Sequence, residues 1–206
     1  MSGAAFLQRR MYRRVERLKM QIVDHEVYMD LALQEAGKAL AKGEVPIGAV
    51  VVNPEGIVLG KGHNVIEKLG CQTGHAEVQA ISKACKKTEG WRLDDCWLYI
   101  TLEPCFMCLG LIGLSRIKGI CYAAPSPQFG CINILESMIL DTHWKQVIVL
   151  KGLKADESIG MMKRFFERAR GENNRERAKR ISRKGSTSLT REKDGPVGSD
   201  RSAAKR

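Results

Sequence analysis

Long runs of apolar residues are missing from this sequence. No stretch approaches about 18 consecutive apolar residues, the length that a membrane-spanning helix requires. The first twenty residues, MSGAAFLQRRMYRRVERLKM, also lack the continuous apolar segment of a secretory signal. We therefore predict a protein that neither spans a membrane nor is exported.

Paired cysteine spacings are missing as well. The chain of 206 residues has seven cysteines, an odd number, and they do not form the regular pairs of a disulfide-stapled domain. A core of about 150 residues buries roughly 70% of its unfolded surface without such cross-links. The sequence thus favours a cytoplasmic protein whose thiols are free or bind a metal. The alternative is an organelle protein, because the N-terminal arm is Arg-rich and almost free of acidic residues.

The middle of the chain has no net charge. Residues 24–170 contain 17 basic and 17 acidic residues, so the net charge of +11 lies in the two flanks. We predict a basic and helical N-terminal arm at residues 1–23 and a globular domain at 24–170. Residues 171–206 have no aromatic residue and few large aliphatic ones, which predicts a disordered basic tail. Basic flanks favour a polyanionic partner, with merely solvated ends as the alternative.

Helix-like and strand-like segments alternate along the central region. The pattern predicts helices at 25–43, 75–87, 105–117 and 155–171. It predicts a hairpin at 46–64, turning at Asn53-Pro54-Glu55-Gly56, and strands at 96–102, 118–124 and 145–152. The fold class is therefore α/β, a three-layer α-β-α arrangement around a mixed five-stranded sheet. In such folds, ligand-binding groups gather where helices begin at one edge of the sheet.

Two cysteines lie at the start of one predicted helix. Cys105 and Cys108 follow Pro104, a residue that suits the first turn of a helix. The positive end of the helix favours thiolates there. A redox pair is one interpretation of this Cys-x-x-Cys motif. A structural zinc site needs four protein ligands, but the chain has no second such pair, whereas a catalytic zinc needs only three.

The third ligand is predicted at the start of another helix. His75 is followed two residues later by Glu77, and Gly74 lets the chain enter the helix sharply. The whole pattern H-x-E…P-C-x-x-C is the signature of zinc-dependent nucleobase deaminases. In that chemistry the imidazole and two thiolates hold Zn²⁺, the fourth position takes water, and the glutamate transfers protons as ammonia leaves. A zinc-bound RNA-binding module without catalysis would keep the cysteines but would not need Glu77.

The central region resembles the bacterial tRNA-specific adenosine deaminases, within the cytidine-deaminase-like superfamily. The resemblance covers roughly residues 24–170 and includes the stretches GEVPIGAVVV, GKGHN, HAE, WRLDDCWLYITLEPCFMCLG, SRI and KRFFERAR. It implies a homodimer that converts adenosine to inosine at the wobble position of the tRNA anticodon loop. It also implies one Zn²⁺ per subunit on His75, Cys105 and Cys108, with Glu77 as the proton shuttle. Substrate contacts are implied for Asn64, Ala76 and Phe166.

One loop departs from the family pattern. Residues 124–130 read APSPQFG, with Ser126 where the family commonly has aspartate. The family places this loop beside the substrate nucleotide, so a charged contact is lost and two prolines stiffen the loop. The alternative function is deamination of a free nucleobase, guanine or cytosine, which would use the same zinc residues.

Overall fold

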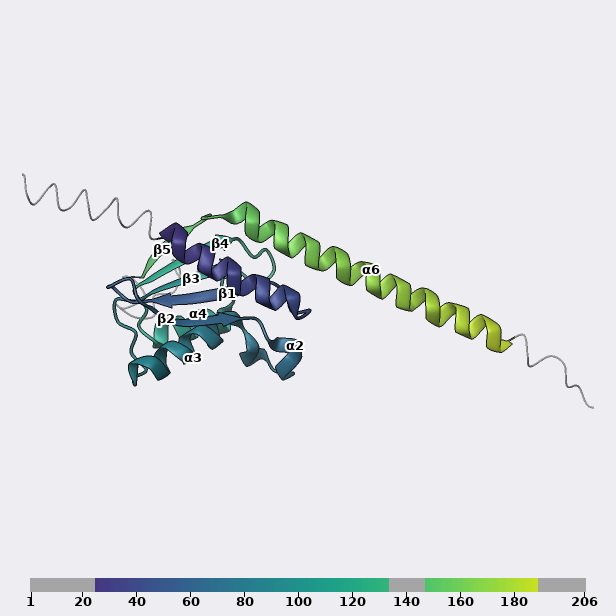
Figure 1. Ribbon diagram of the computed structural model, residues 1–206, viewed down its shortest axis with the longest axis horizontal. Helices are drawn as coiled ribbons and strands as arrows, with labels where there is room; N and C mark the ends of the chain where they lie inside the picture. Colours follow the sequence, from purple (N-terminus) through teal and green to yellow (C-terminus); the bar gives the residue numbers. More distant parts are fainter. Residues whose placement is uncertain (1–24, 134–146, 189–206) are drawn as a thin grey trace, which may run out of the picture. The chain divides into compact units, whose positions relative to one another are not determined.

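The structure, a computed structural model, describes residues 25–133 and 147–188 (Figure 1). The predicted N-terminal arm and residues 189–206 of the predicted tail lie outside these ranges. The chain divides into two compact units, Met1–Phe165 and Phe166–Arg206, whose relative placement is not determined. The architecture below is that of the first unit.

A five-stranded mixed sheet forms the centre of this unit. Its strands are β1 (Gly48–Val52), β2 (Val58–His63), β3 (Trp97–Leu102), β4 (Gly119–Ala124) and β5 (Ile148–Lys151), in the order β2-β1-β3-β4-β5. Strand β1 is antiparallel to both of its neighbours, whereas β3, β4 and β5 are parallel. The predicted mixed five-stranded sheet is thereby confirmed.

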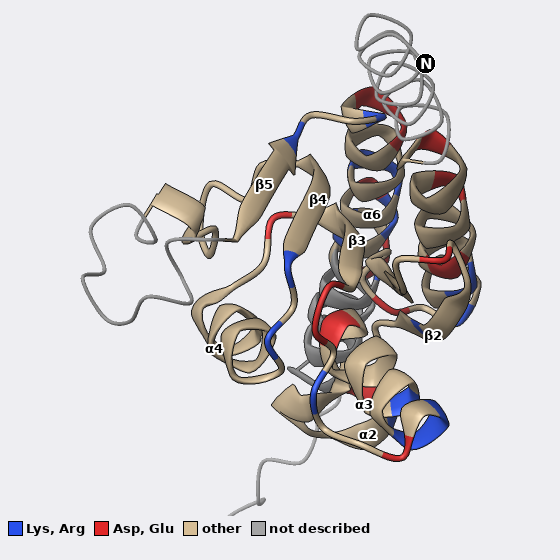
Figure 2. Ribbon diagram, turned by 90° about the vertical axis from the view of Figure 1, so that its left-hand side faces the viewer, with Lys and Arg blue, Asp and Glu red and all other residues tan. Residues whose placement is uncertain are grey.

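Helices cover both faces of the sheet. The helix at residues 25–41 (helix 25–41) precedes β1, α3 (Ala76–Thr88) follows β2, and α4 (Phe106–Leu114) follows β3. Figure 2 shows α3 and α4 on the same side of the sheet. Helix α6 (Ala155–Ser188) begins after β5, and the Ser158 hydroxyl donates to the carbonyl oxygen of Thr101 in β3.

Side-chain alternation along the strands produces two apolar layers. In β1, Ala49 and Val51 pack in the larger core with α3 and α4, whereas Val50 and Val52 pack with Met29 of helix 25–41. The same alternation holds in β3 and β4, because successive residues of a strand point to opposite faces. These two cores confirm the three-layer α-β-α prediction.

Glycines in β2 allow α3 to lie unusually close to the sheet. A Cβ atom on Gly60 would lie 2.1 Å from the carbonyl oxygen of Ala80, and one on Gly62 would lie 2.2 Å from that of Ala76. These are contacts with backbone, which cannot rotate away. The absence of side chains at these two positions therefore sets the height of the N-terminal end of α3 above the sheet.

Two features differ from the sequence-based expectations. Helix α6 continues to Ser188, so residues 171–188 are helical where we expected a disordered tail. The segment has no proline, and it contains four Arg, two Lys and two Glu, residues that have high helix propensity. The connection between β2 and α3 also contains two short helices that we did not predict, α2 (Ile66–Leu69) and η1 (Gln72–Gly74). Among the described residues, no helix has the length and apolarity to cross a membrane.

Candidate metal centre and active site

His75 occupies the position just before the first turn of α3. Its backbone is extended, with φ −61° and ψ 144°, and its side chain makes no capping hydrogen bond to the helix. The ring Nε2 lies 3.4 Å from the side-chain oxygen of Gln72 in η1. This contact orients the imidazole ring and leaves Nδ1 as the ring nitrogen available to other groups.

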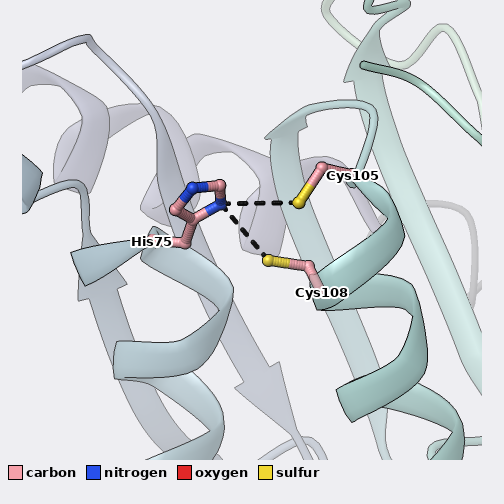
Figure 3. Close-up of side chains that lie close together, drawn as sticks. All are labelled: His75, Cys105 and Cys108. Carbon is pink, nitrogen blue, oxygen red and sulfur yellow. Dashed lines mark hydrogen bonds between the residues drawn. The ribbon is translucent and has the colours of Figure 1, made fainter. Parts of the chain in front are cut away.

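Cys105 and Cys108 present their sulfur atoms to His75 from the start of α4. Cys105 stands before the first turn of this helix and Cys108 lies within that turn. Nδ1 of His75 is 3.7 Å from Sγ of Cys105 and 3.4 Å from Sγ of Cys108 (Figure 3). The three ligand atoms all lie within 4.8 Å of one another. The structure thus brings together the three residues that the sequence predicted as ligands.

The donor set and its spacing fit a zinc ion. Zinc binds imidazole nitrogen at about 2.0 Å and thiolate sulfur at about 2.3 Å in tetrahedral sites. Two such ligands around one ion lie about 3.5 Å apart, and the nitrogen–sulfur distances here are 3.4 and 3.7 Å. Three protein ligands leave a fourth position, which distinguishes a catalytic site from a structural one.

The three predicted ligand residues are also linked by hydrogen bonds, and a bound cation would displace protons from them. A hydrogen bond from Cys108, with another from His75, lowers the pKa of the Cys105 thiol to about 4. The hydrogen bond to Cys105, together with burial, raises the pKa of Cys108. The pKa of His75 is raised, mainly by its hydrogen bond to Cys105. Metal binding would release the protons held by Cys108 and His75.

Glu77 is the buried acid beside this cluster. Glu77 lies in the first turn of α3 and is only 4% exposed. Burial raises the pKa of its carboxyl above the usual 4.5, although the neighbouring His75 and a hydrogen bond from Cys108 oppose this. A buried carboxyl with a raised pKa is suited to accept a proton and return it.

The predicted substrate residues fall into two groups. Asn64 and Ala76 are both buried and lie at the active-site ends of β2 and α3. The side-chain amide of Asn64 donates to Glu44 at 3.3 Å, so its Oδ1 atom is the acceptor that remains for a ligand. Phe166 is 43% exposed and is the first residue of the second unit, whose placement relative to the other site residues is not determined.

Glu44 is a site residue that the sequence analysis missed. Its carboxylate is buried and accepts from the Asn64 side chain and from the backbone N–H groups of Glu67 and Lys68 in α2. These hydrogen bonds fix both the Asn64 amide and the start of the connection to His75. The only signal in the sequence is an acidic residue two positions before a proline, in a segment that usually forms a solvated loop.

Glu103 was also missed. Its carboxylate accepts from the backbone N–H groups of Ser126 at 3.1 Å and Ile132 at 3.0 Å. A Cβ atom on Gly130 would lie 2.2 Å from the Glu103 carboxylate, so glycine is required there. The APSPQFG loop is therefore held against the segment that leads into Cys105.

Comparison with known proteins gives a consistent picture. The MafB19-like deaminase family matches residues 23–170. The tRNA-specific adenosine deaminase of Bacillus subtilis is 40% identical over 146 residues, covering 70% of this chain and 90% of that protein. A solved structure from work on A-to-I editing by tRNA:A34 deaminases at the wobble position of tRNA has a TM-score of 0.61 and 37% identity. The match covers 65% of this chain and 97% of that one.

A more distant solved structure shares the fold. The guanine deaminase of Nitrosomonas europaea has a TM-score of 0.57 at 24% identity, covering 68% of this chain and 83% of that one. At this identity the likeness concerns the fold alone.

Proposed function

The chain belongs to the tRNA-specific adenosine deaminases, and from this membership we propose that it converts adenosine to inosine at the wobble position of a tRNA anticodon loop. The reaction is a hydrolytic deamination, in which water replaces the exocyclic amine of the base and ammonia leaves. The observation that carries the proposal is the convergence of one imidazole and two thiol groups beside a buried carboxyl.

His75, Cys105 and Cys108 would hold one Zn²⁺ per subunit. Their ligand atoms come from the starts of two helices, and the hydrogen bond between His75 and Gln72 orients the imidazole for this role. A zinc ion bound there supplies Lewis-acid activation of a water molecule. The same three groups in a redox or structural role would give no function to the neighbouring carboxyl.

Glu77 moves the protons in this scheme. As a carboxylate it accepts one proton from the attacking water, and as a carboxylic acid it donates a proton to the ring nitrogen. It completes the reaction by transferring a proton to the departing amine. Its burial supports this role, because burial raises the pKa of the carboxyl and so favours uptake of a proton.

Recognition of the substrate falls to residues around this centre. Asn64 would hydrogen-bond the target nucleotide through Oδ1, because Glu44 already engages its amide nitrogen. The backbone at Ala76 would line the same pocket, and Phe166 would meet the anticodon loop from α6. A cytoplasmic location is part of the proposal, and it is supported by the seven cysteines, all of which are free thiols.

A homodimer is supported by the apolar outer face of α4. One side of this helix packs in the core through Cys108, Leu109 and Ile112. The other side exposes Phe106 (58%), Met107 (41%) and Leu114 (77%). A helix that is apolar all round is normally covered on both sides. We propose that a second copy of the chain covers the exposed side.

The test of the enzymatic proposal is nucleoside analysis of tRNA after incubation with the zinc-loaded protein. We expect inosine from bulk tRNA and no turnover of free adenosine, cytidine or guanine. Glu77→Ala should retain zinc but lower the rate by at least about 10²-fold, because it removes only the proton carrier. His75→Ala is the matched control and should lose both zinc and activity.

Two outcomes would contradict the proposal. Inosine formation by Glu77→Ala at the wild-type rate would exclude the proton-shuttle role. Turnover of free guanine or cytosine without any inosine in tRNA would assign the chain to the free-base deaminases instead.

A further inference from the structure

A groove runs beside the edge strand of the sheet, outside the metal centre. Strand β2 is at one end of the strand order, so one of its sides is not covered by another strand. In Figure 1 this strand lies between helix 25–41 and α3. The groove has a volume of about 490 Å³. It is lined by Glu35, Lys38, Val58, Leu59, Gly60, Lys61, His63 and Lys83.

Lysines from three elements line this groove. We define the basic groove by Lys38 of helix 25–41, Lys42 directly after that helix, Lys61 of β2, and Lys83 and Lys87 of α3. Residues 24–170 have no net charge as a whole. The basic groove is therefore a local concentration of positive charge and not a reflection of the overall composition.

Two of these ammonium groups are held in place by the strand. Lys83 Nζ donates to the carbonyl oxygen of Lys61 at 2.8 Å, and Lys87 Nζ donates to that of Val58 at 2.9 Å. An ammonium group has three donors, so each of these lysines keeps two for a ligand. Because these side chains are already ordered, they lose less conformational entropy when an anion binds.

The acid in the groove is already neutralised. Glu35 is 4% exposed, and its carboxylate pairs with Lys38 at 2.6 Å and with His63 at 3.1 Å. The other ring nitrogen of His63 lies 2.9 Å from Lys42 Nζ. Glu35 thus holds the groove lining together, and the remaining lysines determine the sign of its potential.

One end of the groove adjoins the active site. Gly62 of β2 contacts the backbone of Ala76, the residue after His75, and His63 is followed by Asn64. A strand of six residues spans about 20 Å. A chain leaving the active site at His63 could therefore follow the strand across several phosphates.

We propose that the basic groove binds the phosphodiester backbone of the substrate tRNA next to the anticodon loop. The inference rests on the proposed function, since it takes the nucleic acid from that reaction. Pinned ammonium groups along a strand edge suit a sequence-independent contact with phosphates, which sets register and affinity but does not choose the base.

The test compares two pairs of lysine substitutions that change the net charge equally. Lys61→Gln with Lys83→Gln alters the groove. Lys118→Gln with Lys151→Gln alters the opposite end of the sheet, where both residues are exposed. Binding of the zinc-loaded protein to tRNA is measured between about 50 and 200 mM salt, together with the rate of inosine formation at saturating tRNA.

We expect the groove pair to reduce the slope of log Kd against log salt by roughly 1.4–1.8 and to weaken binding at 0.1 M salt by roughly tenfold or more. The rate at saturating tRNA should not change, and the control pair should leave both the slope and the affinity near the wild-type values. Lys61→Arg with Lys83→Arg keeps the charges and should retain the wild-type slope.

Equal effects of the groove pair and the control pair would overturn the inference, because bulk charge would then explain the binding. An unchanged slope in the groove pair would overturn it as well. Failure of the proposed function is a separate result, since in that case the wild-type protein forms no inosine at all.

Discussion

Two buried carboxylates, Glu77 and Glu35, differ in what surrounds them. Burial is the largest influence on Glu77 and raises the pKa of its carboxyl. Burial also acts to raise the pKa of Glu35, but the hydrogen bonds and charges of Lys38 and His63 together lower it below 4.5. Glu77 is therefore suited to exchange protons, whereas Glu35 stays charged and holds its neighbours.

The lowered pKa of Glu35 predicts a pH-dependent contribution to stability. A carboxyl whose pKa is lower in the folded state stabilises the fold above its unfolded pKa, which is about 4.5 here, and this contribution is lost as the pH falls through the folded value. Glu35→Gln should reduce the free energy of unfolding by about 1–3 kcal/mol at pH 7. The difference from the wild-type protein should shrink as the pH is lowered below 4.5, which urea unfolding at a series of pH values would measure.

Glu55→Gln is the control for this prediction, because Glu55 is exposed in the turn between β1 and β2. It should leave stability nearly unchanged at every pH. A constant difference between Glu35→Gln and the wild-type protein across this range would show that Glu35 acts by packing and not by charge.

At the residue scale, the sequence was sufficient to predict functional side chains that lie close together in one short motif. His75 with Glu77, and Cys105 with Cys108, could be paired because each pair lies within a single helical turn. Glu44 and Glu103 could not be predicted, because their partners lie at least 20 residues away in the chain. Such contacts depend on the fold, and a single carboxylate in a loop carries no local sign of them.

At the scale of elements, the contact between β2 and α3 determines where His75 lies. Gly62→Ala would place a methyl group 2.2 Å from the carbonyl oxygen of Ala76, and the helix start would have to move. We expect a loss of about 1–3 kcal/mol in stability. Zinc affinity and inosine formation should fall as well, because the displaced segment carries His75. Thermal unfolding and metal titration would measure these effects.

Gly171→Ala is the matched control for the same change of residue type. Gly171 lies within α6 and has no atom within 4 Å of an added Cβ. Alanine should stabilise the helix there by up to about 1 kcal/mol, owing to its higher propensity. Wild-type zinc affinity in Gly62→Ala would contradict the proposed link between strand packing and the metal site.

The elements that the sequence predicted well are those with a strong internal pattern. The alternating and apolar strands and the helices at α3 and α4 have such patterns. The short helices α2 and η1 do not, because α2 begins where Glu44 accepts two of its backbone N–H groups. The length of α6 was underestimated because low apolar content was interpreted as disorder, although the Arg, Lys and Glu residues of the segment have high helix propensity.

At the scale of the whole molecule, the exposed face of α4 predicts association. Leu114→Glu would place a charge within the proposed contact, and in a symmetric dimer the change occurs twice. We expect the variant to sediment as a monomer where the wild-type chain of 23.0 kDa sediments as a dimer. Ile57→Glu is the control, since Ile57 is similarly exposed in a turn. A monomeric wild-type protein, or a dimeric Leu114→Glu variant, would exclude this interface.

The starts of α3 and α4 have one further consequence. Helices usually satisfy their first N–H groups with a side-chain cap, yet His75 and Cys105 make no such bond. Both side chains instead face a shared point between segments 30 residues apart in the chain. A metal ion bound at that point would act as a cross-link between the two helix starts and close the loop between them. The supply of metal would then determine how well this part of the chain is ordered. A chelator would thus act on this protein as a local denaturant as well as an inhibitor.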